Sequence, residues 1–134
     1  NVASVNETLG YLKSSMKELE SFISNMNGNT DDIRVVVSNI KAVSGNINKL
    51  VAELDTLVSD ADTAVAAINS ADLAGTVNSL KQLLDSMNNP AGSLGKLLSD
   101  DAVHNSVDSL LNNLNQLVSK IQENPKKYLK ISVF

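Results

Sequence analysis

A seven-residue repeat of apolar side chains runs through the first half of the chain and restricts that half to long helices. Every seventh residue from position 5 to position 68 is apolar. The members are Val5, Leu12, Leu19, Met26, Ile33, Ile40, Ile47, Leu54, Ala61 and Ile68. A second apolar set interleaves with the first at three- and four-residue steps, so that one apolar band follows one face of a helix. A strict heptad also favours left-handed supercoiling against a neighbouring helix.

Breaks in this pattern divide the chain into helices. We expect helices at about residues 2–26, 30–70 and 73–87, which together form a heptad-patterned region at residues 1–89. A second region, residues 90–134, is expected to contain a glycine-rich turn, a final helix at about residues 101–123 and a short extended C-terminal tail.

Residues 27–32 allow two interpretations. Gly28 suits the end of one helix, and Asp31 and Asp32 suit the first turn of the next, which predicts a tight turn. Met26 and Ile33, however, are seven residues apart and keep the heptad phase, which is consistent with a continuous rod. We favour the turn.

The expected fold is therefore all-α, with long amphipathic helices in an elongated antiparallel bundle or coiled coil. A helix over residues 30–70 would be roughly 60 Å long at 1.5 Å per residue. Because that exceeds the length of either later helix, we expect the third and fourth helices to pack in succession along it. Four apolar stripes can cover one another without a partner, so we expect the chain by itself to be a monomeric bundle.

Composition narrows the function. Apolar residues make up 43% of the chain but aromatic residues only 3%, which is typical of an aliphatic helix seam. The net charge is −4 and no basic stripe is present, so we expect no nucleic-acid partner. The sequence has no cysteine and one histidine, His104, which leaves no zinc site and no Cys/His nucleophile pair. We expect neither enzyme activity nor a cofactor or metal.

The same sequence has no run approaching the roughly 18 consecutive apolar residues of a membrane-spanning helix. It begins at Asn1 rather than Met and reads as an excised piece of a longer protein. The apolar stripe is then the main functional signal, with two interpretations. It forms an intramolecular core, or it forms a seam between subunits or the wall of an apolar conduit. The residues assigned to that seam or to lipid contact are Ile33, Ile40, Ile47, Leu54 and Ile68.

A more specific signal lies in the last third of the chain. The sequence Gly-Ser-Leu-Gly-Lys-Leu-Leu-Ser-Asp at residues 92–100 is followed by an Asn/Leu-rich helix and then by Asn-Pro-Lys-Lys-Tyr at residues 124–128. The defining positions are Gly92, Leu94, Gly95, Leu97, Leu98 and Asp100 in the turn, and Asn124, Pro125 and Tyr128 near the C-terminus. Residues 90–134 resemble the C-terminal part of MCE-family (MlaD-like) proteins of the Bacteroidetes type, whereas residues 1–89 match only as an Asn/Ser-rich helical region.

This resemblance implies a function. MlaD-like proteins are periplasmic substrate-binding components of ABC lipid transport systems, which work with a permease and an ATPase to move phospholipids or other lipids. They usually form homohexamers around an apolar pore. The resemblance implies that an N-terminal segment absent from this chain anchors the protein in the inner membrane. The alternative is a structural coiled-coil spacer or stalk of a cell-envelope protein that handles no lipid.

Overall fold

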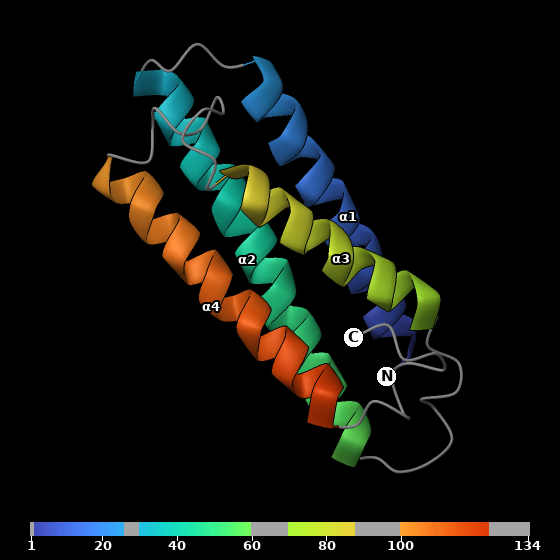
Figure 1. Cartoon of the computed structure of the whole chain (residues 1–134). Helices are drawn as coiled ribbons and strands as arrows, with labels where there is room; N and C mark the ends of the chain where they lie inside the picture. The colour runs from blue at the N-terminus through green and yellow to red at the C-terminus, as the bar shows by residue number, and fades with distance from the viewer. Residues whose placement is uncertain (1, 26–29, 60–69, 88–99, 124–134) are drawn as a thin grey trace.

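Four helices packed side by side make up the part of the chain that the structure describes (Figure 1). The structure, a computed structural model, describes residues 2–25, 30–59, 70–87 and 100–123. The helices are α1 (Val2–Asn25), α2 (Thr30–Ser59), α3 (Ser70–Met87) and α4 (Asp101–Glu123), and these residues contain no strand. The predicted all-α helical bundle is confirmed. The predicted C-terminal tail lies outside the described residues.

The first two helices run antiparallel. The Thr8 hydroxyl of α1 donates a hydrogen bond to Glu53 of α2. Two helical turns later along α1, the Ser15 hydroxyl accepts a hydrogen bond from the Asn46 amide of α2. Residue numbers therefore fall along α2 as they rise along α1. The chain therefore reverses its direction between Asn25 at the end of α1 and Thr30 at the start of α2, and the two helices do not form one continuous rod.

The other helices complete a ring in the order α1, α2, α4, α3. The extensive contacts of α2 are with α1 on one side and α4 on the other, and α3 lies against α1 and α4. Figure 1 shows that α1 and α3 run in one direction and that α2 and α4 run in the opposite direction. The expectation that the third and fourth helices pack in succession along the second is therefore wrong, because α3 lies diagonally opposite α2.

The predicted extent of the second helix is described only in part. The heptad pattern extends this helix to about residue 70, whereas the structure describes α2 from Thr30 to Ser59, and Ser70 is the first residue of α3. The predicted stretch at residues 60–69 lies outside the described residues.

Polar side chains fix two of the helix starts. Asp31 and Asp32 lie in the first turn of α2, where the helix dipole favours negative charge. Asp100 precedes α4, and its Oδ1 accepts hydrogen bonds from the backbone N–H groups of Ala102 at 2.9 Å and Val103 at 3.3 Å. It is an N-cap that satisfies donors without a partner inside the helix.

The core is aliphatic along the whole bundle. Among the described residues, its buried members include two methionines and no aromatic residue, and Phe22 is only partly buried against it. The side chains with no more than 1% exposure and the largest volumes are Leu9, Leu12, Leu19, Ile40, Ile47, Leu50, Leu54, Leu73, Leu80 and Met87. Five of these ten residues, namely Leu12, Leu19, Ile40, Ile47 and Leu54, lie at the heptad positions named above, as the sequence pattern predicts.

Candidate functional site

The apolar interior between the four helices is the candidate site, because it contains buried side chains from every described helix. Ile40, Ile47 and Leu54 of α2 have no exposed surface, and Ile33 at the start of the same stripe is partly buried. The fifth predicted seam residue, Ile68, lies outside the described residues. In this arrangement the three buried side chains contact helices of their own chain. Within this single chain, the three side chains are members of its buried core.

Both helices beside α2 present the same kind of surface. The buried apolar residues of α1 are Val5, Leu9, Leu12, Met16 and Leu19, and those of α4 are Val103, Val107, Leu110, Leu114, Leu117 and Ile121. Together, α1, α2 and α4 form a trough with aliphatic walls and floor. The buried face of α3 closes its fourth side, through Leu73, Ala74, Val77, Leu80, Leu83, Leu84 and Met87.

Polar contacts along the edges hold α1 and α4 to α2. On the α1 side, Thr8 donates to Glu53 over 2.5 Å and Asn46 donates to Ser15 over 3.1 Å. On the α4 side, the Lys120 ammonium lies 2.8 Å from the Asp55 carboxylate. This hydrogen bond to Asp55 raises the pKa of Lys120 above its ordinary value, with a smaller contribution from Glu123. Polar contacts thus join α1 to α2 at two places along the bundle and α4 to α2 at a third.

A groove of about 450 Å³ separates parts of α1 and α3. Lys13 and Met16 of α1 line it, together with Gly75, Thr76 and Ser79 of α3. Across this groove, Lys13 forms an ion pair with Asp72 in the first turn of α3. The α1–α3 boundary is therefore lined largely by charged and small polar side chains, in contrast to the aliphatic interior below it.

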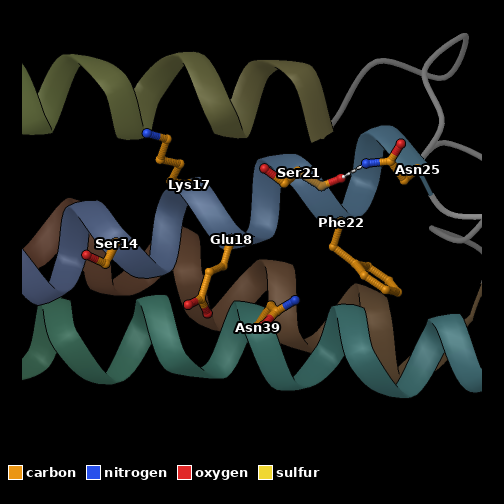
Figure 2. Close-up of a pocket in the computed structure, with 7 residues that line it drawn as sticks. All are labelled: Ser14, Lys17, Glu18, Ser21, Phe22, Asn25 and Asn39. Atoms are coloured by element: carbon orange, nitrogen blue, oxygen red, sulfur yellow. Dashed lines mark hydrogen bonds between the residues drawn. The ribbon is translucent and has the colours of Figure 1, made fainter.

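A second, more open groove of about 670 Å³ lies over α1 and α2 (Figure 2). Figure 2 shows the Phe22 ring pointing from α1 toward α2 beside Asn39, while Lys17 extends toward α3. Asn25 Nδ2 donates to the Ser21 carbonyl oxygen over 2.8 Å. The lining is a mixture of hydroxyl, amide and charged groups around one partly buried ring, which gives little shape for a specific ligand.

Catalytic chemistry has few candidates in this part of the chain. His104 is exposed at the start of α4 and lies 3.3 Å from Asp108, one turn along the same helix. Among the described residues, no group of three or more His, Asp or Glu side chains is arranged to hold a metal ion. Within those same ranges, no helix combines the length and apolarity needed to cross a membrane.

The sequence motif residues are divided by what the structure describes. Asp100 of the turn motif caps α4 through its side chain, as described above. The other turn residues, Gly92, Leu94, Gly95, Leu97 and Leu98, lie outside the described residues, and so do Asn124, Pro125 and Tyr128. Their assignment as a family motif stays a sequence-based prediction.

Sequence reasoning missed the polar contacts at the helix boundaries. Thr8 and Glu53 are 45 residues apart, and Lys13 and Asp72 are 59 residues apart. A heptad pattern reports which residues leave water and carries no signal for such distant partners. The one usable signal in the sequence was the position of Thr8, a polar residue next to the apolar Leu9. In the structure, the Thr8 side chain is 1% exposed.

Comparison with known families decides the identity of this bundle. A family model described as "probable MCE-like lipid transporter, helical needle domain" matches residues 1–127. The chain belongs to this family. The match spans the whole described bundle and includes residues 1–89, which by sequence alone resembled the family only in style. Neither the curated proteins nor the solved structures yielded a match to the needle domain.

Family membership indicates what kind of component this needle domain is. It is a helical domain of an MCE-like lipid transporter, which points to a transport component of the cell envelope and not to an enzyme. The structure adds that the needle domain has a mainly aliphatic interior, in which the buried apolar residues of α2 extend from Val36 to Leu54. At 1.5 Å per residue, that stretch of α2 is roughly 27 Å long.

Proposed function

We propose that the needle domain is the periplasmic helical part of an MlaD-type substrate-binding component in an ABC phospholipid transport system. In this proposal the protein is anchored in the inner membrane by an N-terminal segment outside this sequence, and a permease and an ATPase supply the driving force. The protein forms a homohexamer, and the chain described here acts by helix packing and by shielding acyl chains from water.

One observation carries this proposal: a chain matched to a lipid-transporter family over residues 1–127 devotes its interior to aliphatic side chains. A phospholipid in transit needs a dry apolar surface, because each buried CH₂ group contributes about 0.8 kcal/mol. Leu, Ile and Val side chains offer that surface without polar atoms that would need partners of their own. Of the four buried polar residues in the described part of the chain, Thr8, Thr76 and Ser106 donate hydrogen bonds within the chain, whereas the buried Ser44 hydroxyl of α2 has no hydrogen-bond partner.

The alternative is a structural spacer, and the burial of Ile40, Ile47 and Leu54 favours it. A stripe that is fully covered by its own chain offers no surface to a second subunit or to a lipid while the bundle is closed. A spacer would need the bundle only as a stiff rod.

Native mass spectrometry separates these functions. The protein that contains this domain would be extracted from its own membrane in mild detergent, and its mass and bound lipids measured. Six copies that retain phospholipid, together with copurified permease and ATPase subunits, are the expected result. Lipid-free dimers or trimers would contradict the transport proposal and support the spacer.

Photo-crosslinking adds a site-specific version of this test. A photoreactive amino acid at Ile47 or Leu54 in cells is expected to capture phospholipid if acyl chains enter the interior. The same amino acid at exposed Val35 serves as the matched control on the outer face of α2. Capture at Val35 alone would contradict an interior path.

A further inference from the structure

The weakest side of the bundle is the one that α3 closes. In its described extent, Ser70–Met87, α3 is the shortest of the four helices, with 18 residues, and it packs on α1 and α4 less extensively than these two pack on α2. Figure 1 shows α3 in front of α2, crossing over the trough between α1 and α4. The other three helices form a base, and α3 packs on the side of that base opposite α2.

The contact between α3 and α1 is loose at the level of individual residues. Gly75 faces the groove between the two helices, and a Cβ atom added there would meet nothing within 4 Å. This glycine is therefore not required for close approach of the helices. The neighbouring Thr76 hydroxyl donates to the Asp72 carbonyl oxygen of its own helix, over 2.7 Å, so it needs no partner on α1.

The ion pair between Lys13 and Asp72 is the main polar contact on this boundary, and it is exposed. The two side chains are 49% and 30% exposed, so water is available to solvate both charges when they separate. Exposed ion pairs of this kind contribute little to stability. The polar contact on the α1–α2 edge is less exposed to water, since the buried Thr8 hydroxyl donates to the half-buried Glu53.

The surface beneath α3 fits an acyl chain. Ile40, Ile47 and Leu54 belong to the stripe along its floor, and the walls from α1 and α4 are aliphatic. No Asp, Glu, Lys, Arg or His side chain is buried among the described residues, so an acyl chain would strand no charge.

We propose that α3 is a displaceable cover, and that a phospholipid acyl chain occupies the trough of α1, α2 and α4 when α3 moves away. This inference rests on the proposed transport function and deepens it, because it assigns the lipid-binding surface to the interior of one chain. The phosphate headgroup stays in water at the edge of the trough. The acyl chain replaces the buried face of α3, so apolar surface is covered in both states.

Crosslinking α3 to its base tests this proposal. The chain has no cysteine, so Lys13→Cys with Asp72→Cys introduces one thiol pair across the α1–α3 boundary. The matched control, Ser15→Cys with Asn46→Cys, places a pair across the α1–α2 boundary, where the native side chains are 3.1 Å apart. Both pairs would be joined by the same short bismaleimide with a reducible centre, and circular dichroism would verify the helix content.

The probe is a phospholipid with an environment-sensitive fluorophore at the end of one acyl chain, delivered from phosphatidylethanolamine and phosphatidylglycerol vesicles. The α1–α3 crosslink is expected to weaken probe binding by about tenfold or more, because it removes the binding-competent population. Reduction of the linker should restore binding, and the α1–α2 crosslink should leave it unchanged.

Three outcomes would overturn the proposal: equal binding with and without the α1–α3 crosslink, equal loss with both crosslinks, or no probe binding by the uncrosslinked chain. Its failure is distinguishable from failure of the transport function. Phospholipid retained by the membrane-extracted protein, together with an inert α1–α3 crosslink, would reject the α3 cover alone. Absence of that lipid would reject the transport function.

Discussion

The buried Thr8 hydroxyl of α1 donates a 2.5 Å hydrogen bond to the Glu53 carboxylate of α2, beside the aliphatic core between the two helices. The pair fixes the register of the two antiparallel helices, because a shift along the seam would leave both polar groups without their partner. Burial of an unpartnered polar group is costly, so the contact selects one alignment among several that the apolar stripe alone permits.

Removing this hydroxyl should destabilise the bundle. Thr8→Val keeps the shape of the side chain and is expected to lower the free energy of unfolding by about 1.5–3 kcal/mol, the range for hydrogen bonds to charged groups. Urea unfolding followed by circular dichroism measures the change. Thr56→Val is the control, because the exposed Thr56 hydroxyl bonds only within its own helix, to Ala52. Equal effects of the two variants would argue against a register role.

Truncation in the interior should cost more. Ile47→Ala removes a fully buried side chain from the middle of α2 and is expected to cost about 2–5 kcal/mol, from lost transfer energy and the cavity left behind. Val35→Ala on the exposed face of the same helix should stay within about 0.5 kcal/mol of the native chain. The urea midpoints of the two variants give the comparison. A small effect at Ile47 would show that the described core does not form in solution.

Asp100 gives a test of the one motif residue that the structure describes. Asp100→Ala removes the N-cap of α4 and should cost about 0.5–2 kcal/mol, whereas Asp100→Asn retains an accepting oxygen and should recover most of the loss. Asp108→Ala, further along α4, controls for the loss of one negative charge. If Asn fails to rescue, the contribution of Asp100 is its charge and not its cap.

The Lys13–Asp72 ion pair predicts where the bundle opens first. Lys13→Gln removes the pair without altering α3, and amide hydrogen exchange in α3 should accelerate by up to about fivefold, in line with at most about 1 kcal/mol for an exposed pair. Exchange in α2 should be unchanged. Lys17→Gln, on the same groove, is the control. Uniform acceleration in all helices would mean that α3 opens only with the whole bundle.

Alkaline pH should weaken the α2–α4 edge. Hydrogen bonding to Asp55 raises the pKa of Lys120 above 10.5, so the folded chain holds this proton more tightly than the unfolded chain. The stabilisation is fully present below the unfolded pKa and is lost as the pH rises through the folded pKa. Urea midpoints should therefore fall more steeply for the native chain than for Lys120→Met above about pH 10. Lys41→Met, which leaves this contact in place, should follow the native curve.

The heptad pattern predicted burial well and neighbours poorly. Ile40, Ile47 and Leu54 are buried as their spacing indicates, because a helix that folds in water must cover its apolar face. The same spacing is satisfied by any aliphatic neighbour. It carries no information that α2 lies between α1 and α4, or that α3 lies diagonally opposite α2.

The sequence likewise predicted one property of the candidate site and not another. Its aliphatic character could be read from composition, since 43% apolar and 3% aromatic residues leave few other ways to fill an interior. Its boundaries could not, because they depend on contacts such as Lys13–Asp72 between residues distant in sequence. The predicted part of the second helix beyond Ser59 lies outside the described residues.

The placement of α2 between the first and last helices has a consequence for synthesis on the ribosome. One flank of α2 is covered by α1, which is made before it, but the other flank waits for α4, whose residues emerge only after position 100. A nascent chain therefore carries a bare aliphatic surface for as long as translation of the intervening residues lasts. Premature termination before α4 would make that exposure permanent and leave a product prone to aggregation or capture by chaperones.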